Sequence, residues 1–240
     1  MKLVADLHIH TVASGHAYST VIEIAQVAAA KGLAMVAITD HGPAMPGGPH
    51  PYHFGNQRAI PEDLYGVRIL KGVEANIIDR SGNLDLDERR LSRLDIVLAG
   101  LHTYCAPYGT VAENTAMLIN AMNNPWVDVI VHPGNPEYPI DEPAIVQAAA
   151  ELGVALEINN SSLCGARKGS EPHCKNIASL AKRYGAKLIV GTDSHFATSV
   201  GEFGAALALL AECGVPEELV INTSLDKIWQ HLRRRTNRRR

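Results

Sequence analysis

Seven short runs of apolar residues divide the chain, and each has the pattern of a strand that is buried on both faces. They lie at residues 2–7, 34–39, 67–77, 94–100, 127–132, 154–160 and 187–193. Apolar residues within them are nearly continuous, which is typical of parallel strands covered by helices on either side.

Amphipathic stretches rich in alanine and leucine lie between these runs, at residues 21–31, 112–123, 141–152, 171–184 and 202–213. Gly32, Gly153, Gly185 and Gly214 each follow a helical pattern, and glycine is common just past a helix C-terminus. Strands that alternate with helices in this way predict a single α/β domain. A closed or nearly closed parallel barrel is favoured, with a doubly wound open sheet as the alternative.

One long segment departs from this alternation. Residues 42–63 are rich in proline and glycine and form a connection longer than compact folds usually contain. We expect this segment to form a lid or a wall of a pocket.

Composition places the chain among ordinary globular proteins, with 46% hydrophobic residues in 240 and a net charge of −3. No apolar run reaches the roughly 18 residues that a membrane span needs. Four cysteines without CxxC spacing predict reduced thiols, and with no secretory signal pattern the expected location is the cytoplasm. We assign residues 1–232 to the barrel and expect the basic tail, residues 233–240, to be disordered.

Histidine and acidic side chains gather where the predicted strands end. Nine of them lie in or just after these runs: His8, His10, His16, His41, Glu74, His102, His132, Asp193 and His195. The C-terminal ends of parallel strands meet at one face, so these side chains are expected to converge there. One zinc ion needs only three or four protein ligands, so nine indicate two or three metal ions.

Other polar residues have weaker patterns. Asp6 and Asp40 adjoin expected ligands and are interpreted as partners that orient imidazole rings. His50 and His53, in the long loop, are interpreted as substrate contacts or surface residues. Glu157 has two open interpretations, as an acid or base at the metals or as a core carboxylate. His173 and His231 are expected to be structural.

A basic segment follows the sixth run and is expected to bind phosphate. Arg167 and Lys168 provide positive charge there, and Ser161 and Ser162 provide hydroxyl donors. Arginine suits phosphate because its planar guanidinium can donate two parallel hydrogen bonds. An ordinary basic loop is the alternative.

The motifs DLHIHT, TDHG, GVEAN, GLH, HPGNP and GTDSH occur in this order, and as a set the chain resembles the PHP (polymerase and histidinol phosphatase) superfamily. The segments HTVASGHAYST, HPGNPEYPID and EINNSS…RKGSE resemble its YcdX-type phosphatase branch. The resemblance spans residues 3–228. It implies a distorted (β/α)7 barrel with a trinuclear metal centre at the C-terminal ends of the strands.

The resemblance also implies how the ligands are shared among three divalent ions per chain. The first ion would be held by His8, His10, Glu74 and Asp193, the second by His16, His41 and His195, and the third by Glu74, His102 and His132. Glu74 would bridge the first and third ions. Zinc is the expected metal, although Mn²⁺ and Fe²⁺ accept the same ligands.

This site predicts a hydrolase of phosphate monoesters in which a metal-bound hydroxide attacks phosphorus directly. The expected partner is a small phosphorylated substrate. The alternatives are a phosphodiesterase or exonuclease of the PHP type, and an inactive metal-binding PHP module. The arginine-rich tail gives slight support to nucleic acid as a partner, and a homo-oligomer is left open.

Overall fold

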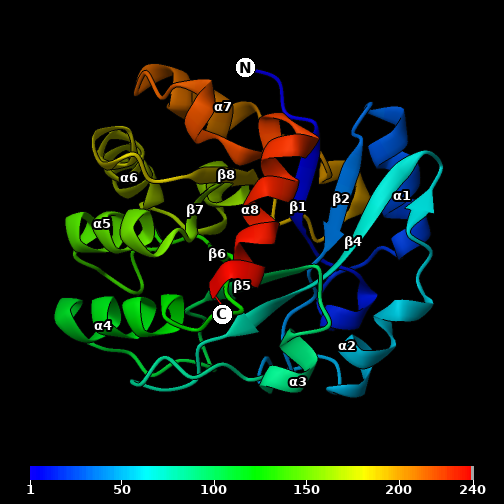
Figure 1. Ribbon diagram of the computed structural model, residues 1–240, viewed down its shortest axis with the longest axis horizontal. Helices are drawn as coiled ribbons and strands as arrows, with labels where there is room; N and C mark the ends of the chain where they lie inside the picture. The colour runs from blue at the N-terminus through cyan, green and yellow to red at the C-terminus, as the bar shows by residue number, and fades with distance from the viewer. Residues whose placement is uncertain (239–240) are drawn as a thin grey trace.

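A parallel sheet curved nearly into a barrel forms the centre of the molecule (Figure 1). The computed structural model describes residues 1–238, and in that range seven parallel strands follow the order β1-β2-β4-β5-β6-β7-β8. The short β3 (Asp63–Leu64) pairs antiparallel with β4. The parallel strands are β1 (Ala5–Ile9), β2 (Met35–Ile38), β4 (Val67–Asn76), β5 (Ile96–Gly100), β6 (Val129–Ile130), β7 (Ala155–Asn159) and β8 (Leu188–Gly191). Each overlaps one predicted run, so the (β/α)7 barrel is confirmed.

The barrel closes between β1 and β8 by two different means. Near the C-terminal ends of these strands, the Asp193 backbone N–H donates to the His8 carbonyl at 2.9 Å. Further down, the Asn222 side chain fills the gap. Its Nδ2 donates to the carbonyls of Ala5 and Val190, and its Oδ1 accepts from the Val190 N–H.

Helices surround the sheet (Figure 1), and capping residues explain where several of them begin and end. They are α1 (Val21–Ala30), α2 (Tyr52–Asn56), α3 (Glu88–Leu91), α4 (Val111–Met122), α5 (Glu142–Leu152), α6 (Ser170–Tyr184), α7 (Gly204–Glu212) and α8 (Leu225–Arg238). Capping boxes start α1 and α4. Gly153 and Gly185 end α5 and α6 with φ of 63° and 73°, a conformation that favours glycine.

Helix α8 lies across the barrel (Figure 1) and closes its N-terminal end. Its Ile228 and Leu232 belong to the interior cluster of buried residues, together with Ala5, Met35 and Ile96 at the starts of their strands. A larger cluster packs between the outside of the sheet and the surrounding helices. The opposite end of the barrel is therefore left for polar side chains.

The proline- and glycine-rich segment at residues 42–63 is partly regular. Residues 42–63 contain α2 and the first residue of β3, and their Met45 and Pro46 line a cavity, as expected of a pocket wall.

The expected boundary between the barrel and the basic tail, at residue 232, falls within α8. Disorder of the tail stays a prediction, and residues 239–240 lie outside the described range. Within residues 1–238, no helix is long and apolar enough to cross a membrane.

Candidate metal centre

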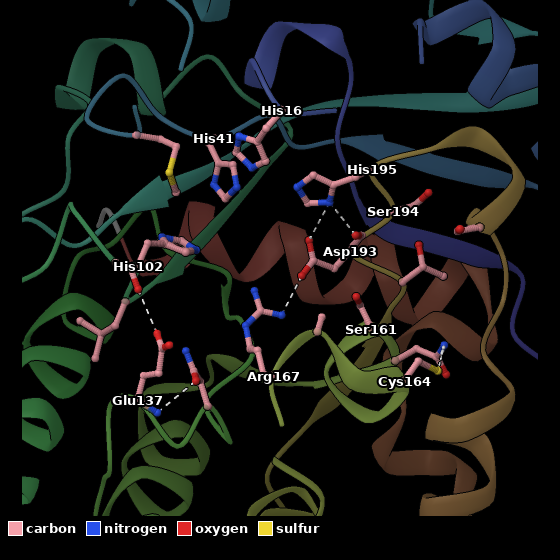
Figure 2. A pocket seen from close by; sticks show the side chains of 18 of the residues that line it. His16, His41, His102, Glu137, Ser161, Cys164, Arg167, Asp193, Ser194 and His195 are labelled. Atoms are coloured by element: carbon pink, nitrogen blue, oxygen red, sulfur yellow. Dashed lines mark hydrogen bonds and ion pairs between the residues drawn. The ribbon is translucent and has the colours of Figure 1, made fainter. Parts of the chain in front are cut away.

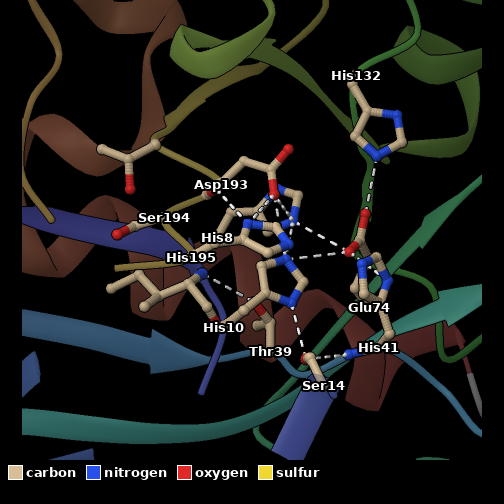
Figure 3. A network of polar contacts seen from close by, with 12 residues as sticks. His8, His10, Ser14, Thr39, His41, Glu74, His132, Asp193, Ser194 and His195 are labelled. Atoms are coloured by element: carbon tan, nitrogen blue, oxygen red, sulfur yellow. Dashed lines mark hydrogen bonds and ion pairs between the residues drawn. The ribbon is translucent and has the colours of Figure 1, made fainter. Parts of the chain in front are cut away.

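All nine side chains expected to bind metal come together at the C-terminal end of the barrel (Figures 2 and 3). Seven of them are buried, His195 is half-buried and His16 is exposed. His16 joins the group through its ring, which lies 5.1 Å from that of His41 and 4.9 Å from that of His195. Whether each side chain is a ligand stays a prediction.

Glu74 is the centre of this cluster. Its Oε1 lies 2.8 Å from Nε2 of both His102 and His132. Its Oε2 faces three more imidazole nitrogens at 2.9 to 3.3 Å, on His41, His8 and His10. A single carboxylate that faces five imidazoles has the arrangement of a group shared between cations.

Asp193 occupies the other side of the cluster. Its Oδ1 lies 3.2 Å from His10 Nε2, and 3.6 Å from both His8 Nε2 and His195 Nδ1. Asp193 and His132 have φ of 53° and 34°, in the left-handed region that residues other than glycine rarely adopt. Backbone strain of this kind is concentrated at functional sites.

Room for these side chains comes from glycine inside the barrel. Along β4 the inward-facing residues are Leu70, Gly72 and Glu74, because alternate residues of a strand point to the same side. On β8, a Cβ added to Gly191 would lie 2.0 Å from Oε1 of Glu157. Gly72 and Gly191 therefore lie between the apolar residues inside the barrel and the polar residues at its C-terminal end.

Electrostatics hold both carboxylates of the cluster in the ionised form and two of its imidazoles in the neutral form, whereas contacts with carboxylates outweigh burial and raise the pKa of His8 and of His10. Burial alone would raise the pKa of Glu74 and of Asp193, but neighbouring positive groups hold both pKa values well below their usual range. Burial lowers the pKa of His41 to about 3 and that of His132 to about 4, so these rings are neutral at pH 7. Neutral imidazole and ionised carboxylate are the forms that coordinate metal.

An outer layer of hydrogen bonds orients the rings. Glu157 Oε1 accepts from His8 Nδ1 at 2.8 Å. Ser14 Oγ accepts from His10 Nδ1 at 3.1 Å and donates to Asp40 Oδ1 at 2.7 Å. Both rings then have Nδ1 protonated, which leaves Nε2 free to face the cluster.

The sequence leaves the role of Glu157 open and gives no signal for Ser14. The signal for Glu157 was its place on β7, where its side chain points to the same side as Asn159. Asp40 does orient an imidazole, although it acts through Ser14. Asp6 instead binds the backbone N–H of Thr192 and Gly201.

The donor set fits divalent cations. Among the described residues, Glu74 Oε2 and His41 Nδ1 are buried polar atoms without a hydrogen-bond partner. Three sets of ligand atoms each lie within 4.8 Å of one another: His10, His41 and His195; His8, His10 and Asp193; and His41, Glu74 and His102. These sets overlap with the grouping that the resemblance implied, but they are not identical to it.

A cavity of about 1030 Å³ opens beside the cluster (Figure 2). Arg167, Lys168 and Ser161 line it, and their role in binding phosphate stays a prediction. Arg167 Nη1 donates to Asp193 Oδ2 at 2.9 Å. Ser162 is buried below the wall, where its Oγ accepts from Arg167 Nη1 at 3.1 Å, so it positions the guanidinium.

Comparison with known proteins gives the family. A family model described as the PHP domain matches residues 6–234. The chain belongs to the PHP domain family. A probable phosphatase of Caldanaerobacter subterraneus subsp. tengcongensis is 54% identical over 239 residues, which cover 99% of this chain and 94% of the relative. A probable phosphatase of Acetivibrio thermocellus is 54% identical over 238 residues, which cover 99% and 98%. The superfamily that the motifs indicated is confirmed.

Solved structures share the fold of this PHP domain at low sequence identity. Histidinol phosphate phosphatase from Lactococcus lactis, solved with zinc, L-histidinol and phosphate, has a TM-score of 0.60 and 17% identity, over 88% of this chain and 94% of that one. A chain of archaeal ribonuclease P, solved with mature tRNA, has a TM-score of 0.60 and 15% identity, over 97% and 91%. At these identities the likeness establishes the fold alone.

Proposed function

We propose that this PHP protein is a metal-dependent phosphatase that hydrolyses phosphate monoesters of small cytoplasmic molecules. The observation that carries the proposal is the convergence of imidazoles on Glu74 and Asp193 beside a cavity that contains Arg167. The close relatives named probable phosphatases support the reaction class, and the zinc-bound histidinol phosphate phosphatase supports metal in this fold.

Three divalent ions are proposed for the centre, with zinc as the metal and Mn²⁺ or Fe²⁺ as substitutes. The ligands would be the nine converging side chains: His8, His10, His16, His41, Glu74, His102, His132, Asp193 and His195. When bound, such ions lower the pKa of a coordinated water and offset charge on the phosphoryl oxygens.

The chain's own residues then hold and orient the ester. Arg167 uses Nη1 to bind Asp193 and Ser162, and the remaining N–H groups of its guanidinium are proposed to bind phosphoryl oxygens. Lys168 adds a second positive charge and Ser161 a hydroxyl donor on the same wall. The pair with Asp193 fixes the guanidinium next to the metal ligands, so the phosphate is placed at the centre.

Two substrates separate this function from its alternatives. Protein purified without chelator is analysed for metal and assayed with p-nitrophenyl phosphate and with bis(p-nitrophenyl) phosphate. We expect more than one ion per chain and faster cleavage of the monoester. Faster cleavage of the diester would replace the proposal with a phosphodiesterase, and bound metal without turnover would indicate an inactive module.

A further inference from the structure

We propose that a second cavity beside the metal centre binds the leaving group of the substrate, and that this group contains a planar aromatic or heterocyclic ring. The inference rests on the proposed phosphatase function and names its substrate class. The second cavity has a volume of about 700 Å³ and shares Thr103 and Tyr104 with the cavity at the metal centre. The two cavities therefore adjoin at these two residues, and an ester with its phosphate near Arg167 is proposed to extend past them into the second cavity.

Tyr104 stands at the boundary between the two cavities in a strained conformation. It lies in a turn in which the Cys105 N–H donates to the His102 carbonyl at 3.1 Å. Tyr104 has φ of 72° as the third residue of this turn, where glycine or asparagine is usual. The residue is 85% exposed, so packing within the chain does not offset the strain. Because Tyr104 also lines both cavities, its strained and exposed ring points to a ligand that uses it.

The wall around Tyr104 is held rigidly. Thr103 Oγ1 donates to Glu137 Oε2 at 2.9 Å and accepts from the Tyr108 hydroxyl at 3.4 Å. Figure 2 shows Glu137 on the same side of the cavity as His102. The Tyr108 ring stacks on the buried Tyr138 with ring centres 5.1 Å apart and planes 13° apart. The second cavity is thus a preformed aromatic surface.

The chemistry of this surface favours an uncharged ring. Its two charged side chains are already engaged, since Asp79 accepts from Asn83 at 2.8 Å and Arg80 pairs with Glu113. The remaining lining residues include Tyr104, Tyr108 and Ile78. Flat rings stack well on exposed aromatic side chains, whereas a second phosphate would need an unpaired cation.

The position of Tyr104 also sets the distance to the reaction. His102, which contacts Glu74 in the metal cluster, begins the turn that Tyr104 occupies. Only Thr103 separates Tyr104 from His102 along the chain, so the turn fixes the position of the ring relative to the cluster. A leaving group with its ring on Tyr104 places its phosphate consistently, which gains rate as well as affinity.

The test compares two substrates that share a primary alkyl phosphate and differ in the planar ring: adenosine 5′-monophosphate and ribose 5-phosphate. Tyr104→Gly removes the ring and relieves the backbone strain, so the variant is expected to fold. Tyr65→Gly is the matched control. Tyr65 is also exposed with φ of 53°, but it lies in the turn between β3 and β4 and, among the described residues, is not part of either cavity wall.

We expect wild type to prefer the ester that contains the ring. Tyr104→Gly should lower kcat/KM for adenosine 5′-monophosphate by roughly 5- to 150-fold, the range of one base stacked on an aromatic side chain. Its kcat/KM for ribose 5-phosphate should stay at the wild-type value, and Tyr65→Gly should change neither. An equal loss for both esters, or no loss, overturns the inference while leaving the phosphatase proposal intact.

Failure of the phosphatase proposal has a different result, because wild type would then hydrolyse neither ester. In that case the ring site is tested by measuring the affinity of metal-loaded protein for adenosine 5′-monophosphate by calorimetry. Weaker binding by Tyr104→Gly than by wild type and Tyr65→Gly supports the site, and equal binding by all three overturns it.

Discussion

Replacing Glu157 by glutamine tests how the outer hydrogen bonds set the metal centre. Glu157 is buried on β7, where its Oε1 accepts from His8 Nδ1 and its Oε2 accepts from the His132 backbone N–H, both at 2.8 Å. A carboxylate can accept from both donors. Glutamine has the same size and shape, but it offers one acceptor oxygen and one donor NH₂ group.

Either orientation of the new amide disturbs a ligand. If its oxygen stays with the His132 N–H, its NH₂ faces His8 Nδ1, and the His8 proton must move to Nε2, the atom that faces the cluster. If the amide turns, NH₂ meets the His132 N–H, and a buried donor without a partner costs about 1–3 kcal/mol. Metal affinity should therefore fall roughly 10- to 100-fold, the usual effect of losing such a partner.

The assay is a graded series of chelator concentrations, with bound metal measured by mass spectrometry and hydrolysis of p-nitrophenyl phosphate measured at each step. Glu142→Gln is the matched control. Glu142 also accepts a hydrogen bond from a histidine, His173 Nδ1 at 2.5 Å, but neither residue belongs to the metal cluster. That variant should keep the wild-type metal curve. A Glu157→Gln protein with wild-type metal retention and rate would refute the reasoning.

Three further changes have expected outcomes. Glu74→Ala should lower the number of bound ions and abolish turnover, and full metal content with full rate would contradict a bridging role. Arg167→Ala should raise KM, with an added fall in kcat because Asp193 loses its partner; unchanged KM and kcat would exclude Arg167 from the site. Asn222→Ala removes three buried hydrogen bonds, two of them to the backbone N–H and carbonyl of Val190. It should lower the free energy of unfolding, measured by urea titration, by roughly 3 kcal/mol. A loss below about 1 kcal/mol would mean that backbone hydrogen bonds alone close the barrel.

Local signals explain why strands and helices could be predicted. The run at residues 187–193 is apolar enough to indicate β8, and Thr110 with Glu113 forms the capping box that starts α4. Barrel closure had no comparable signal. Asn222 is separated from Ala5 by most of the chain, and an isolated asparagine has no pattern that identifies two strands as its partners.

The metal centre could be predicted in part for the same reason. Histidine after a strand end combines a residue type and a place, and both are visible in His41 or His102. Ser14 and Tyr104 have neither advantage. A serine in a loop has many functions, and the backbone strain of Tyr104 depends on a turn whose geometry the sequence does not reveal.

The charge balance of the cluster depends both on the metal-binding side chains and on the hydrogen bonds that orient them. Burial lowers the pKa of His10, yet its contacts with Asp193 and Glu74 raise that pKa to about 9. The carboxylates thus favour a positive charge at His10 Nε2, and that charge is either a proton or a metal ion. Metal and protons then compete for the same nitrogen, so binding must release protons and must weaken as the pH falls. Ser14, which holds the other ring nitrogen of His10, directs this competition to the face that meets the cluster.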